Sequence, residues 1–144
     1  MTIEELLARE EIRRTLAAYN IAGDRARAEE LAATFTEDGI LEVPGARHEG
    51  RDTILQWIRG IGRSSDAAEI TKATFVRHHI TTCHIELTGR ETATARTYFA
   101  VFTDIGPDHC GFYSDIFRKE GDRWLITHRK ARLDWKSPQS TFTA

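Results

Sequence analysis

Three polar residues have the types that acid/base chemistry requires: Tyr19, Asp24 and His79. Residues 75–88 are rich in β-branched and aromatic side chains and contain no Gly or Pro, which predicts one long strand. Because side chains alternate along a strand, His79 is expected on the face that carries the strand's apolar residues. A carboxylate bonded to one nitrogen of an inward imidazole fixes its tautomer and leaves the other nitrogen as a base.

Each of these residues also has a purely structural interpretation. Asp24 stands where a helix N-cap belongs, and Asp is a favoured cap. His79 has the position of a core histidine with satisfied hydrogen bonds, and Tyr19 lies on the apolar stripe of a helix, where it can pack with its hydroxyl bonded. The same alternation places His78 and His84 on the opposite face, toward solvent or another subunit.

Four further residues are candidates for substrate binding: Trp57, Tyr113, Asp115 and Arg129. Trp57 belongs to the inward side of a predicted helix. Tyr113 and Asp115 share one face of a predicted strand. Arg129 alternates with apolar inward residues, so its charge needs a partner, which is either Asp115 or an anionic ligand.

The elements that must position these residues follow from periodicity and turn signals. Helical spacing predicts three helices early in the chain, the first opened by a Thr2–Glu5 capping box, and an antiparallel meander of long strands after them. This order favours an α+β fold with the helices on one face of a curved sheet. The predicted helices cover 2–22, 24–34 and 50–59, a loop covers 60–69, and the predicted strands cover 40–43, 75–88, 91–104, 109–119 and 123–135.

Composition limits the function classes. The chain has 144 residues, a net charge of −2 and no basic run, which argues against nucleic acid or an anionic membrane as partner. The two cysteines and the absence of a signal-peptide pattern favour a cytoplasmic protein, and no His or Cys spacing indicates a metal site. One domain is expected over residues 1–136, followed by a loose tail over 137–144.

Short motifs along most of the chain resemble those of the SnoaL-like domains in the nuclear transport factor 2-like superfamily. The resemblance implies a cone of three N-terminal helices on a curved, mainly antiparallel sheet, assembled as a homodimer or homotrimer through the outer face of the sheet. It is carried by Tyr19-Asn-Ile-Ala-Gly-Asp24, Phe35-Thr-Glu-Asp-Gly39, Gly50-Arg-Asp52, Arg77-His-His79, Arg96-Thr-Tyr98, Gly111-Phe-Tyr-Ser-Asp115 and the segment from Trp124 to Trp135.

The site pattern is similar to that of scytalone dehydratase and hexachlorocyclohexane dehydrochlorinase, both of which use an Asp–His pair. The resemblance therefore implies that Asp24 orients His79 as a general base in an apolar pocket, with Tyr19 or Tyr113 as a hydrogen-bond donor. The expected protein is a cofactor-independent dehydratase, lyase, isomerase or cyclase acting on a small, largely apolar, cyclic or aromatic molecule.

Two alternatives remain at this point. One is a non-catalytic ligand-binding or accessory subunit resembling the small subunit of ring-hydroxylating dioxygenases. The other is an epoxide hydrolase of the same fold, in which Asp24, Arg129 and Asp115 would surround a water molecule.

Overall fold

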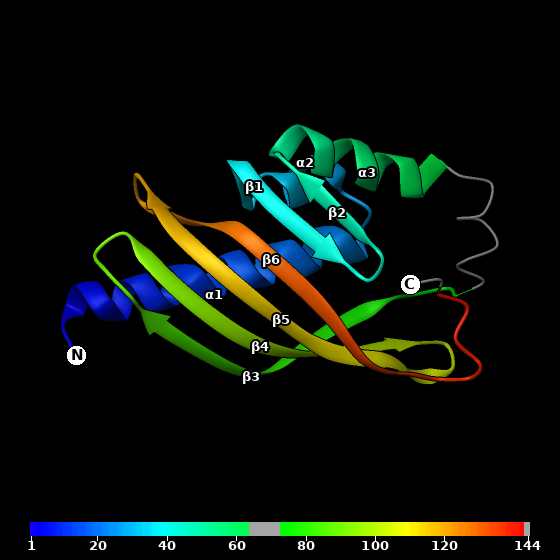
Figure 1. The fold of residues 1–144 in the computed structure, drawn as a ribbon. Coiled ribbons are helices and arrows are strands. Elements are labelled where there is room, and N and C mark those ends of the chain that lie inside the picture. Colours follow the sequence, from blue (N-terminus) through cyan, green and yellow to red (C-terminus); the bar gives the residue numbers. More distant parts are fainter. Residues whose placement is uncertain (64–72, 143–144) are drawn as a thin grey trace.

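The computed structural model describes residues 1–63 and 73–142. The chain begins with a long helix and ends with four long strands (Figure 1). In chain order the elements are α1 (Ile3–Asp24), α2 (Ala28–Ala32), β1 (Phe35–Val43), β2 (Ala46–Glu49), α3 (Arg51–Arg63), β3 (Arg77–Leu87), β4 (Thr92–Thr103), β5 (Gly106–Glu120) and β6 (Arg123–Lys136).

In the described residues the strands form one six-stranded sheet in the order β2-β1-β6-β5-β4-β3. Neighbouring strands run antiparallel, except for the parallel pair of β1 and β6. Register shifts interrupt four of the five strand pairs, and such irregularities bend and twist a sheet. The predicted α+β fold with a curved, mainly antiparallel sheet is therefore confirmed.

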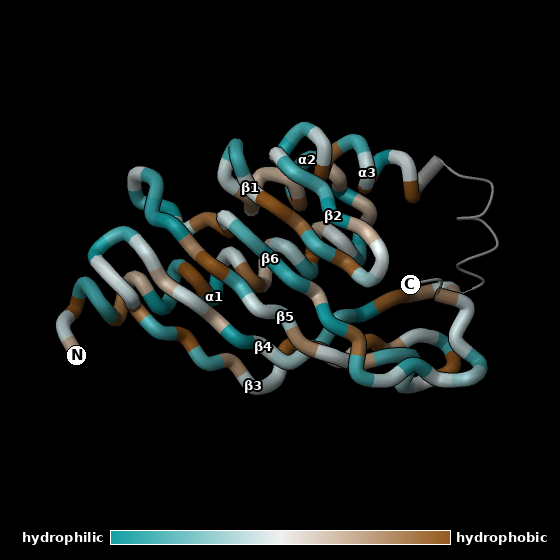
Figure 2. Tube along the Cα trace, viewed as in Figure 1, coloured by the Kyte–Doolittle hydropathy of each residue, from teal (hydrophilic) through white to brown (hydrophobic). Residues whose placement is uncertain are grey.

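The helices bury one face of this sheet. The predicted Thr2–Glu5 capping box is present at the start of α1, which runs along the sheet, while α2 and α3 lie beside β1 and β2 (Figure 1). Apolar and polar residues alternate along the strands (Figure 2), and the buried apolar strand residues form one cluster with those of the helices. The largest fully buried apolar side chains are Phe35, Phe117, Ile12, Leu16, Leu41, Ile54 and Ile126.

No helix in the described part of the chain is long and apolar enough to cross a membrane.

Several boundaries differ from the sequence prediction. β1 begins at Phe35 rather than at residue 40, and β2 was not predicted because its four residues are mostly exposed and show no alternation. Of the loop predicted over 60–69, residues 60–63 continue α3, and the remainder lies outside the described residues.

Residues 137–142 of the predicted loose tail contain no helix or strand, but they form hydrogen bonds to Asp108. The backbone N–H of Ser137 donates to the carbonyl of Asp108 at 2.7 Å, and the Ser140 hydroxyl donates to the Asp108 carboxylate at 2.5 Å. The segment after β6 is thus hydrogen-bonded to β5.

A β-bulge in β3 decides which histidine faces the helices. The pairing of β3 with β4 shifts register between Ile80 and Cys83, so that one extra residue stands in β3. Beyond the bulge Cys83 and Ile85 face inward, as alternation predicts. Before it, the inward positions move by one residue, because a single insertion reverses the side to which every preceding side chain points.

Candidate active site

The centre of the candidate site is a carboxylate–imidazole pair formed by Asp24 and His78. Asp24 is the last residue of α1, and His78 is the second residue of β3. One carboxylate oxygen lies 2.5 Å from His78 Nδ1, and the other accepts the backbone N–H of His78 at 2.9 Å. The side chain of Asp24 is only 9% exposed and that of His78 is 24% exposed, so the pair is largely shielded from water.

This geometry assigns a role to each nitrogen of the His78 ring. An ionised carboxylate only accepts hydrogen bonds, so Nδ1 carries a proton and donates it to Asp24. In the neutral ring, Nε2 then keeps its lone pair and can act as a base. The second bond of Asp24, to the main chain, fixes the position of the carboxylate relative to the strand.

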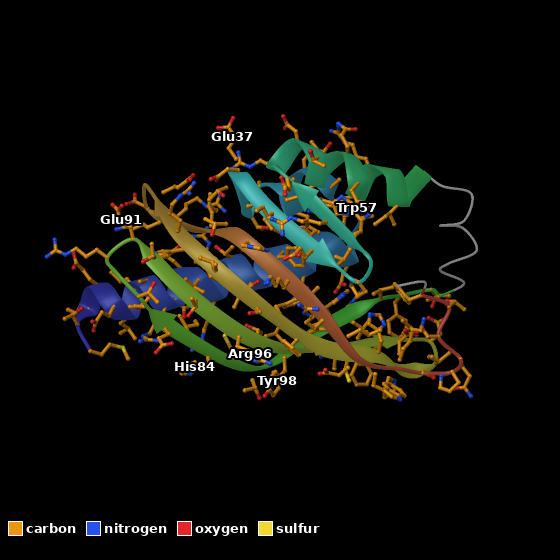
Figure 3. The ribbon with its side chains drawn as sticks, in the orientation of Figure 1. Glu37, Trp57, His84, Glu91, Arg96 and Tyr98 are labelled. Carbon is orange, nitrogen blue, oxygen red and sulfur yellow. The ribbon has the colours of Figure 1, made fainter. Side chains whose placement is uncertain are left out.

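The predicted pairing of Asp24 with His79 is therefore wrong by one residue, and His78 is not on the outward face. His79 is exposed and lies against the exposed ring of Phe102, with 4.9 Å between ring centroids. The cause is the β3 bulge, which uninterrupted alternation does not anticipate. The expected outward position of His84 is confirmed, since its side chain projects away from the helices (Figure 3).

A second imidazole that sequence reasoning missed lies beside His78. His109, on β5, has its ring centroid 6.4 Å from that of His78 in an edge-to-face arrangement. Its Nδ1 lies 2.7 Å from the carboxylate of Asp108, which also accepts hydrogen bonds from Thr103 and Ser140. By the argument used for His78, the Nε2 of His109 is also free to exchange a proton.

Asp108 is held as an anion by these contacts. Burial raises the pKa of the carboxyl, but hydrogen bonds from Ser140, His109 and Thr103 outweigh burial and hold the pKa below its usual range. The only sequence signal for this second pair was the adjacent Asp108-His109 dipeptide at the start of a strand.

Aromatic rings extend from the two histidines into the protein. Phe99 lies 6.2 Å from His78 and stacks on Tyr113 at 4.7 Å, and the Tyr113 ring meets Tyr19 edge-on at 5.9 Å. Burial raises the pKa of both tyrosine hydroxyls above the ordinary value. Both phenols therefore remain protonated at neutral pH, and the Tyr113 hydroxyl donates to the side-chain oxygen of Asn20 at 3.1 Å.

Asp115 and Arg129 lie beneath this aromatic wall. They form a two-bond ion pair with both N–O distances at 2.8 Å, and neither side chain is exposed. The guanidinium lies 4.1 Å from the ring centre of Tyr19 and 3.8 Å from that of Tyr113, which favours cation–π attraction. Of the two partners predicted for Arg129, the structure shows Asp115.

Direct substrate binding by Asp115 and Arg129 stays a prediction, and it would have to compete with an ion pair that is fully buried. The same contacts count against the epoxide hydrolase alternative, in which Asp115 would have to hold a water molecule.

Trp57 lies on α3 (Figure 3) and is half-buried. Its ring stacks on that of His48 from β2, with 4.6 Å between ring centroids. Burial lowers the pKa of His48, so this imidazole is neutral at physiological pH. Substrate binding by Trp57 stays a prediction.

Two further features bear on the location of the site. An open groove of about 550 Å³ lies between residues 42–47 and residues 130–133, and its lining includes none of the groups described above. In residues 1–63 and 73–142, no cluster of three or more His, Cys, Asp or Glu side chains is arranged to hold a metal ion.

The fold is that of the cone-shaped proteins known as nuclear transport factor 2-like or cystatin-like. Within this class, the model of the SnoaL-like domain matches residues 4–130, which is most of the chain. The chain therefore belongs to the SnoaL-like domain family. No match was found among curated proteins.

Solved structures of the same fold include proteins with different assignments. A protein of Novosphingobium aromaticivorans, provisionally assigned as a scytalone dehydratase, is 25% identical with a TM-score of 0.78 and 95% and 91% coverage of the two chains. Hexachlorocyclohexane dehydrochlorinase LinA-type3 of Novosphingobium barchaimii is 13% identical, with a TM-score of 0.77 and coverage of 99% and 98%. The β subunit of a provisionally assigned aromatic-ring-hydroxylating dioxygenase of N. aromaticivorans is 19% identical, with a TM-score of 0.76 and coverage of 92% and 93%.

Proposed function

We propose that the protein is a cofactor-independent acid/base enzyme of the lyase or isomerase type, acting on a small, largely apolar cyclic molecule. The observation that carries the proposal is the double contact of Asp24 with His78, which fixes the ring and leaves Nε2 as a free base. A base positioned in this way contributes roughly 10²–10⁴-fold to a rate.

The reaction is a proton transfer followed by elimination or by return of the proton. His78 Nε2 removes a proton from a carbon next to a carbonyl or next to a carbon that bears a leaving group. The electron pair of the broken C–H bond forms a double bond, and the leaving group departs. His109, when protonated, supplies the proton that a departing hydroxyl needs, because its ring lies beside that of His78.

Two relatives support the elimination chemistry. A dehydratase removes water and a dehydrochlorinase removes hydrogen chloride, and proteins bearing both names share this fold. The rings of Phe99, Tyr113 and Tyr19 further support a flat, apolar substrate, because they form a continuous aromatic wall next to the base.

The test compares two adjacent histidines. Purified wild type, His78→Ala, Asp24→Asn and His79→Ala are assayed on a panel of cyclic hydroxyketones and halogenated cyclohexanes. The proposal predicts a loss of roughly 10²–10⁴-fold for His78→Ala and a marked loss for Asp24→Asn. His79→Ala is the matched control, because that side chain is exposed and outside the site, and its activity should equal that of wild type. Equal activity of wild type and His78→Ala on a turned-over substrate would refute the proposal.

A second candidate function is an accessory subunit, as in the dioxygenase β subunit of the same fold. The observation that favours it is the exposed apolar surface on the outer face of the sheet, where Tyr98 and Ile116 are each 48% exposed. Capture of a catalytic oxygenase subunit by this protein, with capture lost in Tyr98→Asp, would support this function. Turnover of a panel compound by the isolated protein would exclude it as the whole function.

A further inference from the structure

Asn20 is a buried side chain placed next to the proposed base. It lies on α1 four residues before Asp24, so both side chains point from the same side of the helix. Asn20 is only 5% exposed, and the hydroxyl of Tyr113 donates to its amide oxygen. Phe99 stacks on Tyr113 and also contacts the ring of His78. The amide thus belongs to the same group of side chains as the base.

Within the described structure, the side-chain amide of Asn20 is hydrogen-bonded through its oxygen but not through its nitrogen. Its nitrogen is buried without any partner among the described residues. Exchanging the amide oxygen and nitrogen does not remedy this, because Tyr113 then bonds the nitrogen and leaves the oxygen unpaired. Buried polar groups are nearly always paired, so an unpaired amide next to a candidate base calls for a functional explanation.

Arg129 also has a buried nitrogen, Nη1, without a partner in the same part of the chain. That cation lies against the faces of Tyr19 and Tyr113, so aromatic rings compensate its charge. Asn20 is neutral and has no comparable compensation. It is therefore the better candidate for a hydrogen bond to a ligand.

We propose that Asn20 is the residue that recognises the substrate's oxygen, and that the substrate is an apolar ring bearing a carbonyl group. The inference rests on the proposed function. When His78 removes a proton from the carbon beside the carbonyl, the electron pair of the C–H bond forms a carbon–carbon double bond and the π pair of the carbonyl moves onto its oxygen. The N–H of Asn20, preorganised by Tyr113, stabilises the negative charge that develops there.

A neutral amide suits a carbonyl better than a carboxylate or phosphate. The burial of an anion requires a cation or several donors, and the buried cation nearest to Tyr113, Arg129, is already committed to Asp115. The protonated hydroxyl of Tyr113 donates to Asn20 and so holds the amide in place.

The test uses two probes that differ only in the carbonyl: 1-tetralone and tetralin. Binding is measured by titration, and the side-chain ¹⁵N–¹H signals of Asn20 are followed by NMR in wild type, Asn20→Leu, Tyr113→Phe and the double variant. We expect wild type to bind 1-tetralone about tenfold more tightly than tetralin, as one hydrogen bond allows. Asn20→Leu and the double variant should bind both probes equally, whereas Tyr113→Phe should keep part of the preference.

Three results would overturn the inference. They are a preference for 1-tetralone that survives in Asn20→Leu, a preference that Tyr113→Phe loses to the same extent as Asn20→Leu, or no binding of either probe to wild type. Melting temperatures separate a folding defect from a binding defect, because the double variant removes both hydrogen-bond partners together and should recover stability lost in Asn20→Leu. Binding is measured without turnover. If His78→Ala did not reduce activity, the proposed function would be refuted, but the measured role of Asn20 in binding the carbonyl would be unaffected.

Discussion

Replacing Asp115 by Asn tests whether the buried ion pair is structural. The substitution keeps the shape of the side chain but leaves the guanidinium of Arg129, which is fully buried, without an anion. Breaking a buried pair by removing one partner typically costs about 3–5 kcal/mol of unfolding free energy. For a domain of this size about 1 kcal/mol corresponds to roughly 3 °C, so the melting temperature should fall by about 9–15 °C.

The assay is thermal and urea unfolding followed by circular dichroism. Asp38→Asn is a matched control, because Asp38 also pairs with an arginine, Arg118, but its side chain is 70% exposed. An exposed pair contributes less than about 1 kcal/mol, so this control should shift the melting temperature by no more than a few degrees.

A paired replacement completes this test. Asp115→Leu combined with Arg129→Met removes both charges and should recover most of the stability lost in Asp115→Asn, because apolar residues often replace a buried ion pair without cost. A melting temperature for Asp115→Asn as high as that of wild type would refute the structural role. It would favour Asp115 as a substrate-binding residue.

Three further predictions concern β5 and the outer face of the sheet. Gly111→Ala should destabilise the protein markedly in urea unfolding, because a Cβ there would lie 1.8 Å from the carbonyl oxygen of Arg132; unchanged stability would contradict the close approach of β5 and β6. Ser140→Ala should lower stability at neutral pH. The difference from wild type should vanish in acid as the pH falls through the depressed pKa of Asp108, since the protonated carboxyl no longer gains from that bond; a difference independent of pH would argue against the contact. We propose that the protein self-associates through the outer face, so Tyr98→Asp should shift the sedimentation coefficient toward that of a monomer, and an unchanged value would exclude this interface.

The architecture was predictable because its signals are local and strong. The Thr2–Glu5 capping box marks the start of α1, and long β-branched stretches separated by turn residues mark the meander. The sequence also left only two candidate partners for Arg129, Asp115 and an anionic ligand, because a cation among apolar inward residues needs a counter-charge.

The identity of the base could not be read from the sequence in this way. Alternation assigns each strand residue to one face of the sheet by its position in the sequence. The bulge after Ile80 adds one residue to the strand, and no residue type in the sequence indicates it. Thr81 and Thr82 are both β-branched and suit a regular strand as well as a bulged one. Only the pairing with β4 shows that the count shifts, which turns His78 inward and His79 outward.

His109 was missed for a different reason. Its importance comes from its proximity to a residue on another strand, and the sequence shows only that it follows Asp108. The hairpin that contains β2 was missed because a short, polar, exposed strand carries no periodic pattern.

The central claim is that Asp24 holds the ring of His78 with the proton on Nδ1. ¹⁵N-edited NMR of the imidazoles measures this directly, with each histidine assigned by substitution. We expect His78 to show the Nδ1–H tautomer and a strongly deshielded ring proton that disappears in Asp24→Asn. A deshielded proton assigned to His79, or a His78 signal unaffected by Asp24→Asn, would contradict the account.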